Sequence, residues 1–221
     1  MTQDVEQARE NMILNQFRPW SVLDNRLLDI LRAIPRENFM PEAYRDLAFV
    51  DMPIPISDDQ ALFPPKMEAR LIQALDVQPS DRILELGTGT GYTAAVLASL
   101  GKKVISVGVN PDVAESARKN VALADIDNID LTFEVGDVAD GWPNHRPYDV
   151  IFVTGSLPVY SDIFEKELCV GGRLLVIVGV SPAMDVMLIT RVTESEWTRE
   201  SLMETDVPPL ADAQQPEKFV F

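Results

Sequence analysis

The glycine-rich run at residues 84–92, LELGTGTGY, is the part of the sequence whose residue types and spacing point most directly to chemistry. Gly87, Gly89 and Gly91 follow an apolar segment and precede a segment of helical pattern. Glycines placed in this way let the backbone turn tightly and let a ligand approach without an intervening Cβ. The NAD fingerprint has its third glycine one residue further along, at position 92, so the spacing departs from that of a dinucleotide site.

Polar residues near this run could hold the rest of a nucleoside cofactor. Glu85 adds a carboxylate that could face a ligand's ammonium group. The end of the next strand normally carries an acidic residue for the ribose hydroxyls, and Gly108 holds that position, with Asn110 and Asp112 nearby but displaced. Asp137, in the segment after a third strand, is placed to accept a hydrogen bond from an adenine amino group. The alternatives are a purely structural glycine turn and a turn-forming Asp137.

The elements that must position these residues alternate between strands and helices. We expect strands at residues 82–86, 103–107, 130–135, 148–154 and 173–178, and helices at 92–100, 111–124 and 161–168. This alternation predicts right-handed βαβ units and a doubly wound, mostly parallel α/β sheet of the Rossmann-like kind. Two further strands, at 185–192 and 197–204, would end the sheet in a hairpin and bring it to about seven strands, which makes it mixed at one edge.

The first third of the chain has a different pattern. Residues 5–17 and 22–34 have helical spacing, residues 52–65 form an extended, proline-rich connection, and a helix restarts near Pro65. We therefore expect one domain over residues 1–221, with three parts. These are a helical extension and site cover (1–65), a cofactor-binding core (66–180), and C-terminal strands with a tail (181–221). The terminal Phe219 and Phe221 are expected to dock on the body of the domain.

The composition of the chain limits the classes of function that it can have. The chain has 221 residues, 46% of them hydrophobic, and a net charge of −16, which disfavours a nucleic-acid partner. The longest apolar runs, such as residues 174–180, are far shorter than the roughly 20 residues of a membrane helix. Cys169 is the single cysteine, so no internal disulfide can form. We expect a monomeric cytoplasmic protein without a signal peptide, a membrane partner or a bound metal.

Several separate blocks, in the right order, give the chain a resemblance to the protein-L-isoaspartate O-methyltransferase family over nearly its whole length. The blocks are IPRENFMP at 34–41 with Ala43-Tyr44, the glycine run, Gly136-Asp137, residues 147–155, Gly171 to Leu174, and Val207 to Leu210. The resemblance implies S-adenosylmethionine as the cofactor and isoaspartyl residues of damaged proteins as the methyl acceptor. The positions it implies for cofactor binding are Glu85, Gly87, Thr88, Gly89, Gly91, Tyr92, Gly108, Asp137 and Val138.

Two departures from the family pattern fall at expected ligand contacts. The family carries an isoleucine-glycine-x-glycine-glutamine stretch that ends in isoleucine-serine-x-proline, with the serine at the active site. Residues 56–65 align with it, but Ser57 and Asp59 replace both glycines and Phe63 stands at the serine position. Gly108 likewise replaces the family's glutamate. No catalytic residue is assigned. The acceptor side is expected to be lined by Leu62, Phe63 and Thr154.

The sequence offers no obvious acid–base pair, since His145 is expected at the surface and Cys169 as a small buried residue. A carboxyl acceptor does not need one, because a carboxylate is ionised near pH 7 and is its own nucleophile. Alignment with the sulfonium methyl group and exclusion of water would then do most of the work. Two alternatives stay open: a weak or inactive relative that only binds a partner, and a methyltransferase for another small acceptor.

Overall fold

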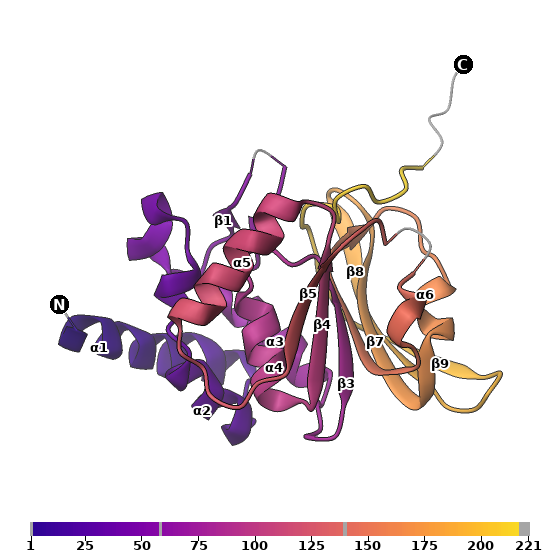
Figure 1. The fold of residues 1–221 in the computed structure, drawn as a ribbon, viewed down its shortest axis with the longest axis horizontal. Coiled ribbons are helices and arrows are strands. Elements are labelled where there is room, and N and C mark those ends of the chain that lie inside the picture. The colour runs from indigo at the N-terminus through magenta and orange to yellow at the C-terminus, as the bar shows by residue number, and fades with distance from the viewer. Residues whose placement is uncertain (1, 58, 139–140, 217–221) are drawn as a thin grey trace, which may run out of the picture.

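The computed structural model describes residues 2–57, 59–138 and 141–216 of the chain, in which one central sheet is covered by helices (Figure 1). Its seven strands lie in the order β5-β4-β3-β6-β7-β8-β9. The first five in that order pair in parallel, and β8 and β9 add antiparallel pairs at the edge. The bounds are β3 Arg82–Leu86, β4 Lys103–Gly108, β5 Leu131–Val135, β6 Tyr148–Leu157, β7 Leu168–Val180, β8 Ala183–Arg191 and β9 Trp197–Thr205. The expected seven-stranded, mostly parallel α/β sheet is confirmed.

The helices of the core alternate with the parallel strands. They are α3 Pro65–Ala74, α4 Tyr92–Leu100, α5 Pro111–Leu123 and α6 Ile163–Lys166. Figure 1 shows α3, α4 and α5 on one side of the sheet and α6 on the other. The helix expected at 161–168 is shorter than predicted, because Leu168 already pairs with Tyr148 as the first residue of β7. The Tyr148 amide donates to the Glu167 carbonyl at 3.0 Å, so the sheet takes over where the helical pattern continues.

The N-terminal extension is helical, as predicted, with short irregular turns. It contains α1 Thr2–Met12, the π-helical turn η1 Ile13–Phe17, the 3₁₀ turns η2 Arg18–Trp20, η3 Arg36–Phe39 and η4 Glu42–Leu47, and α2 Asn25–Ala33. The connection after it is not only a loop: β1 (Ile54–Pro55) and β2 (Ala61–Leu62) pair into a small antiparallel hairpin. Two-residue strands among prolines carry no alternating pattern, which is why the sequence did not predict them. A further 3₁₀ turn, η5, spans Pro143–His145.

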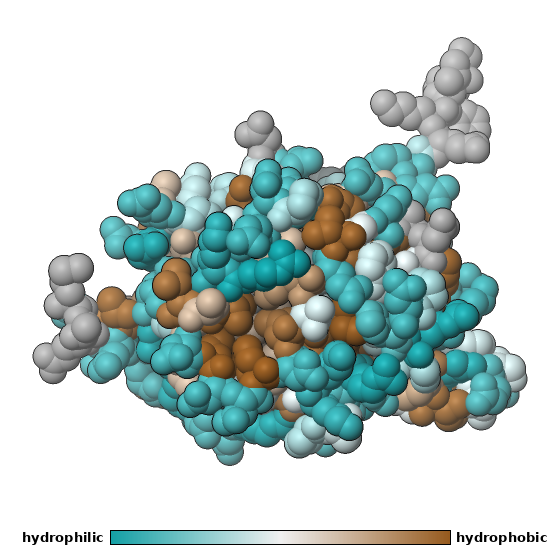
Figure 2. All heavy atoms as spheres, in the orientation of Figure 1, coloured by the Kyte–Doolittle hydropathy of each residue, from teal (hydrophilic) through white to brown (hydrophobic). Residues whose placement is uncertain are grey.

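The core lies on both sides of the sheet. One apolar cluster joins the extension, α3, α4 and one sheet face, and it includes Phe17, Leu28, Leu71 and Val104. The extension therefore packs into the same core as the sheet. A second cluster, around Leu174, lies on the opposite face. Figure 2 shows a mostly hydrophilic surface, with apolar atoms gathered below α5. Among the described helices none is long and apolar enough to cross a membrane. The terminal Phe219 and Phe221 lie outside the described residues.

Candidate functional site

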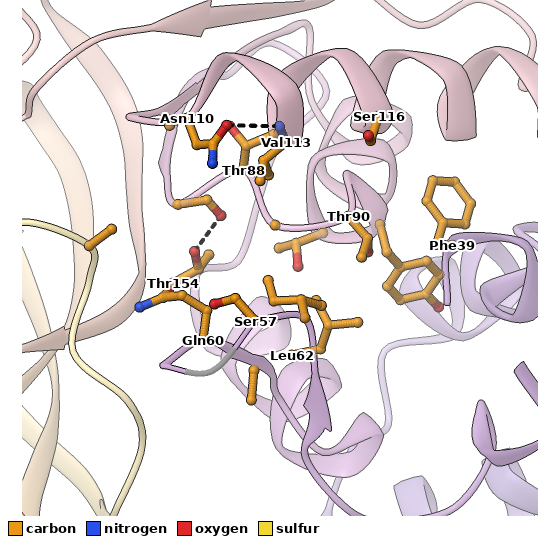
Figure 3. A pocket seen from close by; sticks show the side chains of 18 of the residues that line it. Phe39, Ser57, Gln60, Leu62, Thr88, Thr90, Asn110, Val113, Ser116 and Thr154 are labelled. Carbon is orange, nitrogen blue, oxygen red and sulfur yellow. Dashed lines mark hydrogen bonds between the residues drawn. The ribbon is translucent and has the colours of Figure 1, made fainter. Parts of the chain in front are cut away.

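A cavity of about 720 Å³ lies at the carboxyl ends of β3 and β4. Parallel strands place the loops that follow them at the same edge of the sheet, which is where ligands bind in open α/β folds. The glycine loop between β3 and α4 forms one wall and the hairpin of β1 and β2 faces it (Figure 3). Other parts of the wall come from η3, α5 and the segment around Leu210.

All three glycines of the loop are required by its backbone, and at Gly87 a neighbouring side chain also leaves no room for a Cβ. Gly87, Gly89 and Gly91 have φ angles of 106°, 50° and 85°, in the region that favours glycine. A Cβ on Gly87 would lie 2.3 Å from Oγ1 of Thr154. That hydroxyl is 2.9 Å and 2.7 Å from the carbonyl oxygens of Leu86 and Gly87, to which it donates. Thr154 therefore holds the loop in its turn.

The cavity fits a cofactor that needs close approach to the backbone. A Cβ on Gly89 would lie 3.4 Å from Cδ2 of Leu62 and 3.9 Å from Cδ1 of Ile56, both on the cavity wall. The missing side chain thus leaves space between the loop and the hairpin. Gly91 serves a different purpose, since a Cβ there would lie 3.0 Å from the Cβ of Ala117 in α5. Its lack of a side chain permits close packing of the loop against that helix.

The position expected to bind the ribose carries no side chain. Gly108 lies on the cavity wall, and a Cβ there would be 3.0 Å from Oγ1 of Thr88, which accepts from the Ser106 hydroxyl at 3.0 Å. Asn110 caps α5: its Oδ1 accepts from the amides of Asp112 and Val113 at 2.8 Å and 3.3 Å. Its amide nitrogen points away from the helix, into the cavity region (Figure 3), and donates no hydrogen bond to the described residues.

Two of the acidic side chains expected at the cofactor do not reach the wall of the cavity. Glu85 is fully buried within the sheet, and neither of its carboxylate oxygens has a hydrogen-bond partner in the described chain. Burial, with a smaller contribution from the charge of Glu68, raises the pKa of Glu85 to about 8, although the nearby Ser106 hydroxyl lowers it. Among the described residues Val138 lines the cavity, whereas its neighbour Asp137 does not.

The acceptor-side residues expected from the sequence come together. Leu62, Phe63 and Thr154 all line the cavity, and Phe63 stacks on Phe152 with ring centroids 6.3 Å apart and planes at 28°. The hairpin is joined to the C-terminal segment, because Nε2 of Gln60 donates to the Pro209 carbonyl at 3.0 Å. The described residues on the wall include three acidic side chains, at Asp59, Glu68 and Asp112, and no basic one.

A buried ionic cluster beside the cavity was not predicted from the sequence. Arg36, from the IPRENFMP block, pairs with Glu68 of α3, and both are almost fully buried. Burial alone would lower the pKa of Arg36, but the charge of Glu68 keeps that pKa above its ordinary value. Neither residue stands out in the sequence, because Arg36 is followed by Glu37 and Asn38 and Glu68 lies between Lys66 and Arg70. Helical spacing put Met67, Leu71 and Ile72 on the inner face of α3 but gave no reason to bury Glu68.

The strand order, the glycine loop after β3 and the cavity at the strand ends define a class I methyltransferase. Within that class, the chain belongs to the protein-L-isoaspartate(D-aspartate) O-methyltransferase family, whose family model matches residues 7–215. The resemblance inferred from the sequence blocks is confirmed.

Relatives match over nearly the whole chain. Protein-L-isoaspartate O-methyltransferase 2 of Marinobacter nauticus is 35% identical over 209 residues, which are 94% of each chain. The protein-L-isoaspartate O-methyltransferase of Methanoculleus marisnigri is 38% identical over 197 residues, covering 89% of this chain and 86% of its own.

Solved structures support the fold. A protein-L-isoaspartate O-methyltransferase structure superposes with a TM-score of 0.78 at 26% identity, covering 91% of this chain and 65% of that chain. A Plasmodium falciparum structure described as a protein-L-isoaspartate O-methyltransferase, in complex with S-adenosyl-L-homocysteine, has a TM-score of 0.77 at 18% identity, with coverage of 93% and 97%. At that identity the second structure supports the fold alone.

Proposed function

We propose that this protein is an S-adenosylmethionine-dependent carboxyl methyltransferase that methylates isoaspartyl residues in damaged proteins. The observation that carries the proposal is the cavity between the bare glycine loop and the hairpin, in a chain that matches its family over residues 7–215. Relatives that bear the isoaspartyl methyltransferase name align over 94% and 86% of their own lengths, so nearly the whole chain takes part in the match.

S-adenosylmethionine, when bound, supplies a methyl group activated by a sulfonium. The chain offers Thr88 and the backbone of Gly89 on the loop side and Val138 on the side expected for adenine. Gly108 supplies no carboxylate for the ribose, so Asn110 is the polar side chain best placed to replace it. Asp59 and Asp112 on the wall suit a cationic cofactor, because a sulfonium is favoured by negative charge around it, whereas the charge of Glu68 is balanced by Arg36.

The acceptor carboxylate needs no base, since it is ionised near neutral pH. The chain's task is to orient one carboxylate oxygen and to keep water away. Leu62 and the buried ring of Phe63, stacked on Phe152, provide an apolar wall for this, and Thr154 fixes the loop opposite. Phe63 offers no hydroxyl to the acceptor. Acceptor binding is therefore expected to depend more on backbone groups than the family's serine pattern implies.

Two features of the sequence support proposals about the partner and the cellular compartment of the protein. The net charge of −16 argues for a protein rather than a nucleic-acid partner, and the single cysteine suits a reducing compartment. We propose that the protein acts as a monomer in the cytoplasm. Sedimentation at micromolar concentration tests the first part, because a mass near twice that of the chain would contradict it.

Calorimetry followed by turnover tests the function. S-adenosylmethionine should bind with measurable heat, and an isoaspartyl peptide should then cause S-adenosyl-L-homocysteine to accumulate. Absence of heat at millimolar cofactor would replace the proposal with an inactive relative. Binding without turnover on the isoaspartyl peptide would instead indicate another small acceptor, which the apolar Phe63 wall could favour.

A further inference from the structure

Arg36 lies at the centre of a buried cluster that joins separate walls of the cavity. Only 1% of the residue is exposed. Its Nη1 pairs with the Glu68 carboxylate of α3, and its Nη2 donates to the backbone carbonyl of Phe63 at 3.1 Å. Its Nε donates to the carbonyl of Ala48 in the extension, also at 3.1 Å. One guanidinium therefore holds together the extension, helix α3 and the acceptor wall, which is the side of the cavity formed by Leu62 and Phe63.

The same guanidinium also contacts the helix that follows the glycine loop. The Cζ atom of Arg36 lies 4.7 Å from the ring centroid of Tyr92, the first residue of α4. The Thr93 hydroxyl donates to the second carboxylate oxygen of Glu68 at 2.5 Å. Since Gly91 immediately precedes this turn, the cluster couples the start of α4, and with it the glycine loop, to the segment that carries Phe63.

We propose that Arg36 is a positioning residue for methyl transfer, which holds the backbone of Phe63 on the acceptor wall in register with the glycine loop on the cofactor wall. The inference rests on the proposed function for its activity readout. Its physical basis is that in-line transfer is sensitive to displacements of about 1 Å, which can cost on the order of 100-fold in rate. Water cannot replace the contacts to Phe63, because the guanidinium is buried.

Arg36→Lys is the informative substitution. Lysine keeps a positive charge beside Glu68, so the buried carboxylate is not left unpaired. A single ammonium cannot bond the carbonyls of Phe63 and Ala48 and the Glu68 carboxylate with the planar fork of arginine. The matched control is Arg173→Lys, at a largely buried ion pair with Asp81. Within the part of the chain that the structure describes, neither Arg36 nor Arg173 lines the cavity.

We expect Arg36→Lys to lower kcat/KM for an isoaspartyl peptide by about 10- to 100-fold, mainly through kcat. The Kd of S-adenosyl-L-homocysteine should stay unchanged, and the control variant should keep its kcat/KM. Hydrogen exchange of a peptide covering residues 60–70 should accelerate in Arg36→Lys and not in the control. Should Arg36→Lys fail to fold, Glu68→Asp keeps the buried pair charged but shortens its reach to Arg36, and it should show a smaller loss of kcat with the same faster exchange.

Two results would overturn the inference: unchanged kcat in the folded variant, or an equal loss of kcat in Arg36→Lys and Arg173→Lys, which would mark a general stability effect. The exchange measurement separates this inference from the proposed function. If the unmodified protein shows no turnover on isoaspartyl peptides, the proposed function fails. In that case unaltered exchange at residues 60–70 in the variant would reject the positioning role as well, and local acceleration would support the positioning of that wall.

Discussion

Replacing Gly108 with glutamate tests whether this chain's cofactor site lacks a ribose ligand. A charge-assisted hydrogen bond contributes about 1.5–3 kcal/mol. The new Cβ would lie 3.0 Å from Oγ1 of Thr88 and 3.3 Å from its Cβ, so Thr88 must shift by a few tenths of an ångström. That shift weakens the bond from Ser106, which is worth about 0.5–1.5 kcal/mol. The net gain of about 1–2 kcal/mol predicts roughly 5- to 30-fold tighter binding.

The assay is a calorimetric titration with S-adenosyl-L-homocysteine, which binds without reacting. Gly108→Ala is the control that isolates the cost of the Cβ, and it should bind no more tightly than the unmodified protein. Gly108→Gln has the same length without the charge and should recover only part of the gain. Equal affinity of the Ala, Gln and Glu variants would refute the reasoning. It would mean that Asn110 or Asp112 already serves the ribose and that the site needs no carboxylate at 108.

Three further substitutions test the site. Gly87→Ala places a Cβ 2.3 Å from the Thr154 hydroxyl at a φ of 106°. We therefore expect the free energy of unfolding, measured by urea denaturation, to fall by about 2–4 kcal/mol and to be partly recovered when Thr154→Ala is added. Additive losses in the double variant would contradict the clash. Phe63→Ser removes the stacking on Phe152 and should cost about 3–5 kcal/mol by the same assay, whereas a loss below about 1 kcal/mol would show that the ring is not core. Glu85 has a folded-state pKa of about 8 against an ordinary 4.5, so the folded state binds more protons between these values and stability falls as pH rises through that window. Glu85→Gln should therefore gain stability relative to the unmodified protein from pH 5 to pH 7.5, by up to about 1.4 kcal/mol per pH unit, and a pH-independent difference would contradict the raised pKa.

Much of the fold follows from local patterns. The bounds of β3 and α4 match the predicted 82–86 and 92–100, because an apolar run before the glycines and a buried helix after them leave little ambiguity. The pair β1–β2 was missed, because its strands have two residues each and owe their pairing to tertiary context. The predicted helix at 161–168 was too long, because strand pairing at Leu168 prevailed over helical spacing.

The candidate site was predictable in position but less so in detail. Glycines and strand order locate the loop, and the alignment of family blocks locates Leu62 and Phe63 on the opposite wall. Spacing alone could not tell that the Glu85 side chain is buried behind the loop, since a strand residue can face either layer. The pairing of Arg36 with Glu68 joins residues 32 positions apart and depends on how the extension folds over α3. No local pattern encodes such a contact.

The central claim is that this cavity transfers a methyl group to isoaspartyl carboxylates. The most direct test is a competition in which an isoaspartyl peptide and its aspartyl isomer, isotopically distinguished, are incubated together with the protein and S-adenosylmethionine. Mass spectrometry then reads the methylated fraction of each. We predict a gain of one methyl group on the isoaspartyl peptide with the aspartyl isomer unmodified. Equal methylation of both peptides, or of neither in a protein that binds the cofactor, would contradict the claim.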